Sequence, residues 1–171
     1  MILLARTETL EYGLSMKFSK WLENWDLSKL QLNVGFLQME WSPKDADKDA
    51  AWELYIELLT RITTQPLDDS TGDEQTALDS IYSIFPITRS VIKTKGRDCI
   101  QFTKLAIVVL NQIIRPFTAK WHRLSGEGAF QKDVARSIFR KELEALQKDL
   151  NEYSRMLADM AGVEDLTNLE Y

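Results

Sequence analysis

Hydrophobic positions along most of this chain recur every three to four residues, which is the period of an α-helix. This spacing predicts helices over residues 6–25, 45–64, 73–94, 97–124 and 130–161. Proline lacks an amide N–H and clashes with the preceding helical turn, so we expect a kink or break near Ser83 to Pro86 and a kink at Pro116. The pattern therefore predicts an all-α fold, a bundle of four or five helices.

Two of these helices have distinctive apolar faces. Helix 97–124 contains the run Leu105 to Leu110, which is apolar all round and predicts a position at the centre of the bundle. In helix 130–161 apolar residues recur at alternating spacings of four and three, which is a heptad stripe. The stripe consists of Phe139, Leu143, Leu146, Leu150, Tyr153, Leu157 and Met160. It either packs along the chain's own bundle or forms a coiled-coil contact with another chain. The helix should stop at Gly162 and leave an acidic tail over residues 162–171.

The N-terminal third has a different pattern. Apolar residues alternate around 29–37, which predicts a short strand or an extended arm. We find no second strand in the sequence to pair with it. Four of the five tryptophans also lie in this third, and tryptophan is enriched at the centres of protein interfaces. Residues 1–41 are therefore predicted to form a partner-binding arm, although the same residues would also suit the core of a small bundle. The candidate contact residues are Trp21, Trp25, Leu32, Val34, Phe36 and Trp41.

Composition narrows the class of protein. A length of 171 residues suits a single helical domain over 1–171. The net charge of −5 argues against broad, non-specific binding to nucleic acid or to an anionic membrane, but leaves a local basic patch open. One cysteine, Cys99, and one histidine cannot complete a typical zinc site, so we expect no metal and no cofactor. No apolar run is long enough to span a membrane, so we expect a cytoplasmic protein.

The only histidine suggests candidate chemistry. Arg115 and His122 are seven residues apart, so on one helix they share a face and lie about 10 Å apart along the axis. An imidazole can exchange a proton with the ribose 2′-OH or the leaving oxygen of RNA. A guanidinium can stabilise the charge that grows on the phosphate. The alternative is that Arg115 forms a surface ion pair and His122 packs at a helix end.

The segment Arg115-Pro-Phe-Thr-Ala-Lys-Trp-His122 resembles the motif of HEPN-superfamily ribonucleases. These are small all-helical proteins in which an arginine and a histidine, with four to six residues between them, lie near the end of a helix. The resemblance implies a homodimeric, metal-independent ribonuclease of toxin or antiviral-defence type, with Arg115 and His122 as its catalytic residues. The chain departs from the family at Pro116, where members often have a polar residue.

A basic and aromatic cluster follows in the same segment. Lys120, Trp121 and Arg123, together with Arg115, are predicted to hold a phosphate, a nucleotide or an acidic peptide, with Trp121 as a stacking surface. The alternative is a solvated helix end with the tryptophan folded inward.

Two classes of function follow from these patterns. The first is a non-catalytic protein-interaction module or accessory subunit of a larger assembly, which contacts its partner through the N-terminal third or helix 130–161. The second is the HEPN-like ribonuclease, for which RNA and a second copy of the chain are the partners. The sparse catalytic signals favour the first class.

Overall fold

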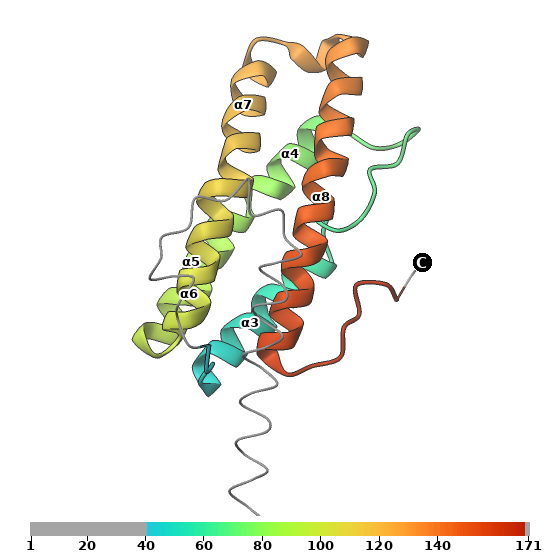
Figure 1. Cartoon of the computed structure of the whole chain (residues 1–171). Helices are drawn as coiled ribbons and strands as arrows, with labels where there is room; N and C mark the ends of the chain where they lie inside the picture. The colour runs from blue at the N-terminus through green and yellow to red at the C-terminus, as the bar shows by residue number, and fades with distance from the viewer. Residues whose placement is uncertain (1–40, 170–171) are drawn as a thin grey trace, which may run out of the picture.

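The computed structural model describes residues 41–169, and this part of the chain is a bundle of α-helices with no strand (Figure 1). The predicted all-α class is therefore confirmed. The predicted helix over 6–25 and the extended segment near 29–37 lie outside the described residues. The helices are α3 (Asp45–Leu59), α4 (Glu74–Tyr82), α5 (Ile84–Lys95), α6 (Ile100–Val109), α7 (Arg115–Gly126) and α8 (Asp133–Ala161).

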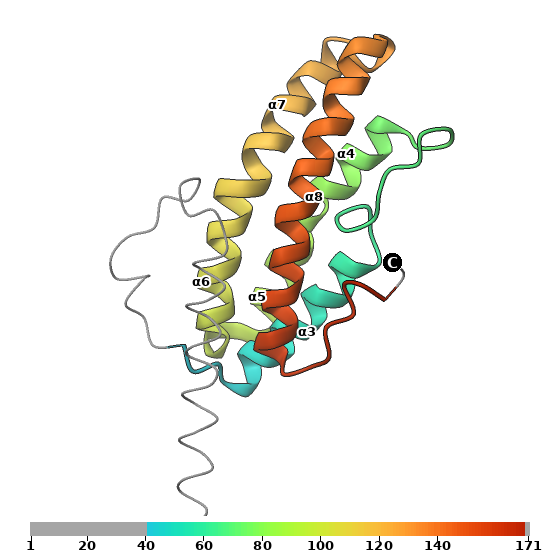
Figure 2. The same ribbon diagram turned by 45° about the vertical axis from the view of Figure 1, so that its right-hand side comes forward.

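Two long rods dominate the bundle. A π-helical turn, Leu110–Ile114, joins α6 to α7, so that the two form one rod. The long helix α8 lies beside this rod, and α3, α4 and α5 pack against the pair (Figures 1 and 2). A 3₁₀ turn, Ala129–Gln131, leads from the end of α7 into α8. No helix within 41–169 has both the length and the apolar character that a membrane span requires.

Helix α3 ends at Leu59, five residues before the predicted end at 64. Threonine hydroxyls explain the early stop, because they donate hydrogen bonds to carbonyls at the end of the helix. Thr60 bonds the carbonyl of Ile56 at 2.8 Å. Thr63 and Thr64 both bond the carbonyl of Leu58, at 2.5 and 3.0 Å. The chain then turns away from the helix axis.

The predicted break near Ser83 to Pro86 is confirmed. Helix α4 ends at Tyr82 and α5 begins at Ile84, with Ser83 between them. Pro86 lies in the first turn of α5, where its missing N–H would have had no helical partner. After the break the two helices have different neighbours, because α4 packs against α7 and α8 and α5 packs against α3.

At Pro116, where a kink is predicted, the structure has a π-helical turn that precedes the proline. Pro116 is the second residue of α7 and cannot donate to a carbonyl of the preceding turn. A π-turn inserts one residue into the helix and accommodates this missing donor without ending the rod.

The start of the rod is held by a carboxylate from another helix. Helix α6 begins at Ile100, three residues later than predicted, and no side chain of its own caps it. Asp47 of α3 is completely buried, and its carboxylate accepts a hydrogen bond from the amide of Phe102 at 2.9 Å. Its other oxygen accepts from the amide of Lys44 at 3.0 Å. Asp47 therefore ties the beginning of α3 to the beginning of the rod.

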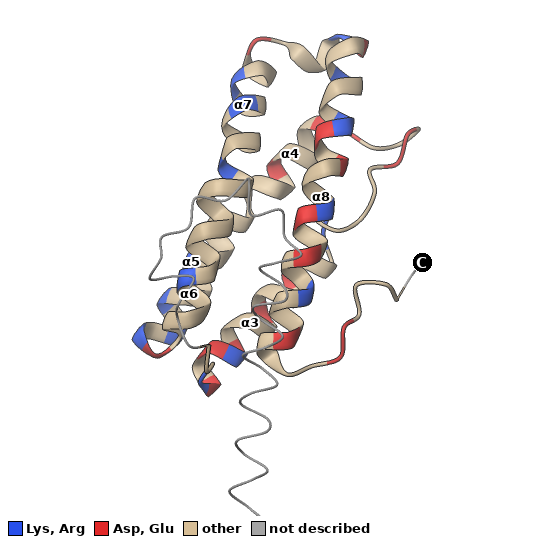
Figure 3. Ribbon diagram, in the orientation of Figure 1, with Lys and Arg blue, Asp and Glu red and all other residues tan. Residues whose placement is uncertain are grey.

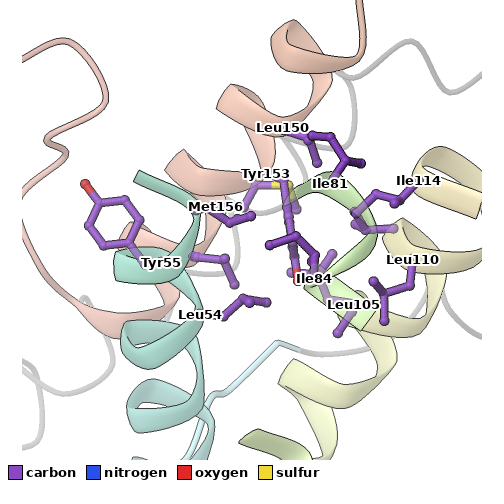
Figure 4. Close-up of a cluster of buried hydrophobic side chains, with 14 of the residues drawn as sticks. Leu54, Tyr55, Ile81, Ile84, Leu105, Leu110, Ile114, Leu150, Tyr153 and Met156 are labelled. Carbon is purple, nitrogen blue, oxygen red and sulfur yellow. The ribbon is translucent and has the colours of Figure 1, made fainter. Parts of the chain in front are cut away.

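The core lies between α3, α8 and the rod, with α4 and α5 closing one side. Figure 4 shows Leu54 of α3, Ile84 of α5, Leu105 of α6 and Tyr153 of α8 gathered in it. All seven residues of the predicted heptad stripe on α8 are buried, so the stripe packs within the chain and is not exposed to a second chain. Cys99 is also buried. The predicted position of the run 105–110 at the centre of the bundle is wrong for one face of the helix, because Ile107 is 49% exposed.

Helix α8 ends as predicted at Gly162, which adopts the left-handed conformation with φ 71°. The chain then runs back along α3. The amide of Leu166 donates to the hydroxyl of Tyr55 at 2.6 Å, and the side chain of Leu166 packs against the core.

Candidate functional site

A pocket between α4, α5 and α7 contains both residues that the sequence singled out for chemistry. Its volume is about 480 Å³, and it opens to solvent. We call it the Arg–His pocket. It is lined by Tyr82, Phe85, Arg89, Arg115, Thr118, Ala119 and His122. No carboxylate is among these residues, so the lining consists of two guanidinium groups and an imidazole together with neutral side chains.

Helical spacing explains why these side chains meet. On α7 the residues 115, 118, 119 and 122 fall on one stripe along the helix face. Phe85 and Arg89 are one turn apart on α5 and face the same space. Helix α4 is held against α7 by a hydrogen bond from the Ser125 hydroxyl to the Gln75 side chain. The pocket therefore forms where α4 and α5 pack against α7.

Arg115 is held in place by two neighbours. Its Nε and Nη2 both donate to Oδ1 of Asn111, at 3.1 and 3.0 Å, and Asn111 belongs to the π-helical turn. Its Cζ lies 5.1 Å from the centre of the Phe85 ring, which is a cation–π contact. Such π-turns occur frequently at functional sites. The guanidinium is thus oriented before any ligand binds, and its Nη1 group has no hydrogen bond within residues 41–169.

His122 lies at the other end of the α7 stripe. Its ring meets the Tyr82 ring edge-on, with centres 5.0 Å apart and an interplanar angle of 77°. Its Nε2 is buried and has no hydrogen-bond partner in the part of the chain that the structure describes. A buried polar atom without a partner is costly, and a functional role is one explanation for such an atom.

The helices around the pocket are strongly basic. Residues 84–126, which include α5, α6 and α7, contain eight Lys and Arg residues and a single acidic residue, Asp98. Figure 3 shows this contrast with α3 and α8, where acidic and basic positions are mixed. Lys95 of this region pairs with Glu53 of α3 at 2.8 Å, and this hydrogen bond raises the pKa of the Lys95 ammonium group. Arg89 forms no ion pair with any residue in 41–169, so its charge is not neutralised there.

The structure separates the predicted cluster of Lys120, Trp121 and Arg123. Lys120 and Trp121 line a second pocket of about 290 Å³ that does not include Arg123. Trp121 is only 1% exposed, and its Nε1 donates to Glu142 of α8 at 2.9 Å. Lys120 pairs with the same carboxylate at 2.5 Å. Arg123 is exposed on α7 but does not line the Arg–His pocket. This arrangement corresponds to the alternative in which the tryptophan is folded inward.

The predicted contact residues of the N-terminal third lie almost entirely outside the described part of the chain. This applies to Trp21, Trp25, Leu32, Val34 and Phe36. Trp41 is the first described residue, and it is buried in the core with 8% of its surface exposed.

Sequence reasoning missed Tyr82, Phe85 and Arg89. They belong to two helices separated by a break, and nothing local links them to the Arg115–His122 segment. The available signal was the uneven distribution of charge, because residues 84–126 carry eight basic side chains and one acidic one within an acidic chain.

Comparison of the chain with protein-family models, curated proteins and solved structures finds no match. Function is therefore inferred from the site's own side chains.

Proposed function

We propose that this protein is a non-catalytic helical interaction module, an accessory subunit of a larger assembly, that binds an acidic partner protein through the basic face around the Arg–His pocket. The observation that carries the proposal is the pocket's lining, which has two arginines, one histidine and no carboxylate. Electrostatic complementarity of this kind steers association and selects against partners of the same sign.

The same lining supports binding over catalysis. Metal-independent RNA cleavage needs one group to remove the 2′-OH proton and another to protonate the leaving oxygen. Each chain supplies a single imidazole and no carboxylate to the pocket. One copy therefore has strong anion-binding groups but lacks an evident acid–base pair.

The test uses a fluorescently labelled poly-glutamate peptide as an acidic probe, with binding followed by anisotropy. We expect the affinity to fall as salt is added. In the double variant Arg89→Gln/Arg115→Gln the affinity should fall by about tenfold, a loss of about 1.4 kcal/mol in binding free energy.

The matched control is Arg136→Gln on α8. Arg136 is about half exposed and lies outside the basic segment, so its replacement removes one charge at a distance from the pocket. Equal affinities for the control and the double variant would contradict the proposal, as would binding that is insensitive to salt.

The second candidate function is a HEPN-like ribonuclease that uses Arg115 and His122. It is favoured by one observation, which is that these two residues line the same pocket while Nε2 of His122 has no partner within residues 41–169. A second copy of the chain would have to supply the second acid–base group.

This candidate predicts cleavage of labelled single-stranded RNA in the presence of EDTA, by a protein that light scattering measures as a dimer. His122→Gln should lower the rate by about 100-fold or more, since general acid–base catalysis contributes that much. Arg123→Gln, on the same helix but outside the pocket, should leave the rate unchanged. If the unaltered protein leaves RNA intact across the pH range, the ribonuclease candidate is wrong.

A further inference from the structure

The Arg–His pocket offers more hydrogen-bond donors than a carboxylate can use. One guanidinium fork can satisfy both oxygens of a carboxylate. The pocket instead has two guanidinium groups on different helices, Arg89 on α5 and Arg115 on α7, together with the imidazole of His122. A phosphate monoester carries three terminal oxygens and close to two negative charges at neutral pH, which matches the two guanidinium groups. A phosphodiester has only two free oxygens and one charge.

The pocket is also larger than a phosphate group. Ligand-binding pockets typically measure about 300–1,000 Å³, and the Arg–His pocket at about 480 Å³ falls within this range. The space beyond the arginines is bounded by Tyr82, Phe85 and Ala119. An organic group attached to the phosphate would therefore have an apolar and aromatic wall to contact.

Tyr82 is the part of this wall best placed to contact a ligand. It is 50% exposed, although its ring is fixed by two other rings. The ring of His122 meets it at 5.0 Å and the ring of Phe85 at 5.7 Å between centres. A rigid, half-exposed ring binds a flat group with little loss of side-chain entropy.

From these observations we propose that the Arg–His pocket is a binding site for a phosphate monoester attached to an aromatic or other flat group. Arg89 and Arg115 hold the phosphate, and Tyr82, with His122 against its ring, contacts the organic group. The inference rests on the proposed function in one respect, because both depend on the positive charge of the same face.

The chain's single histidine makes the test direct, since every imidazole signal in the NMR spectrum of the tag-free protein belongs to His122. Phenyl phosphate, methyl phenyl phosphate and benzoate are titrated at constant ionic strength. We expect phenyl phosphate to bind at least about tenfold more tightly than the diester or the carboxylate, which is the effect of about one additional charge-assisted hydrogen bond. Its titration should shift the signals of His122 and of the Nε–H of Arg89 and Arg115.

Three variants check the assigned roles. Arg89→Gln and Arg115→Gln should each weaken phenyl phosphate binding by about tenfold, whereas Arg123→Gln should leave it unchanged. Tyr82→Ser should lower the affinity for phenyl phosphate to that for inorganic phosphate, without altering the latter. Circular dichroism shows whether each variant keeps its helices. Equal binding of benzoate and phenyl phosphate, or an effect of Arg123→Gln equal to that of Arg89→Gln, would overturn the inference.

Two further probes identify the source of the phosphate. Tighter binding of a phosphotyrosine peptide than of adenosine monophosphate indicates a phosphorylated partner protein, and the reverse order indicates a small-molecule ligand. Either order supports a monoester site. Normal binding of poly-glutamate without binding of phenyl phosphate would reject the inference and leave the proposed function standing. Binding of phenyl phosphate without binding of poly-glutamate would support the phosphate site and reject the proposed binding of an acidic partner protein.

Discussion

Replacing Arg140 with methionine is expected to lower the free energy of unfolding by about 3–5 kcal/mol, because it leaves a buried charge without its partner. Nε of Arg140 donates to Glu74 at 2.7 Å, and the Glu74 side chain is only 7% exposed. The same guanidinium donates to the carbonyls of Asp68 and Gly72, at 2.9 and 2.8 Å. Methionine keeps much of the length of the side chain but removes all of these bonds. Urea denaturation measures the change.

Arg136→Met is the matched control for this prediction. Arg136 is one turn earlier on α8 and also approaches Glu74, but at 3.7 Å and with about half of its side chain exposed. Its loss should cost less than about 1 kcal/mol, as is usual for an exposed ion pair. Adding Glu74→Gln to Arg140→Met should recover part of the stability, because the glutamine carries no buried charge. If Arg140→Met and Arg136→Met had equal free energies of unfolding, Arg140 would not be the residue that neutralises the buried charge of Glu74.

Periodicity predicted which segments are helical, but several helix ends depended on contacts that it does not encode. Helix α3 stops at Leu59 because threonine hydroxyls bond its last carbonyls. Helix α6 begins where a carboxylate of α3, that of Asp47, accepts a hydrogen bond from the amide of Phe102. The prolines were better guides, since each acts on its own backbone. Accordingly, the break before Pro86 was predictable, whereas at Pro116 a kink was predicted and a π-helical turn is found.

The candidate site was predictable on one helix only. Arg115 and His122 share a face of α7 for a reason that the sequence contains, which is a spacing of nearly two helical turns. The residues that complete the pocket, Tyr82 and Arg89, come from α4 and α5, and their approach depends on the angle at the Ser83 break. Local spacing also predicted that Trp121 is exposed and can stack on a ligand. In the structure its Nε1 donates to Glu142 of α8, and the ring is buried.

Net charge was a poor guide to what this face of the protein can bind. A chain of charge −5 suggests weak attraction to anions, but this average combines a basic segment with an acidic remainder. Helices α5, α6 and α7 follow one another in sequence and form one side of the bundle, so charge segregated along the chain becomes charge segregated in space (Figure 3). The distribution of charge per element is therefore more informative here than the total.

Replacing Phe139 with alanine should destabilise the protein by about 3–5 kcal/mol, which is the usual cost of deleting a buried aromatic ring. Phe139 of α8 is completely buried. Its ring centre lies 5.1 Å from that of Trp121, 4.9 Å from that of Phe130 and 5.5 Å from that of Phe117. Because Trp121 directly precedes His122, this cluster also fixes the end of α7 that forms one side of the Arg–His pocket.

The neighbouring Ile138 provides the control. It is 46% exposed, so Ile138→Ala should change the stability by less than about 1 kcal/mol. Phe139→Leu fills part of the space and should fall between the two in urea denaturation. Since the aromatic cluster joins α7 to α8, Phe139→Leu should also increase amide hydrogen exchange in α7 more than in α3, which packs on the other half of α8. If Phe139→Leu increased amide exchange equally in α7 and α3, the cluster would stabilise the whole bundle uniformly. It would then not specifically hold the end of α7 that carries His122.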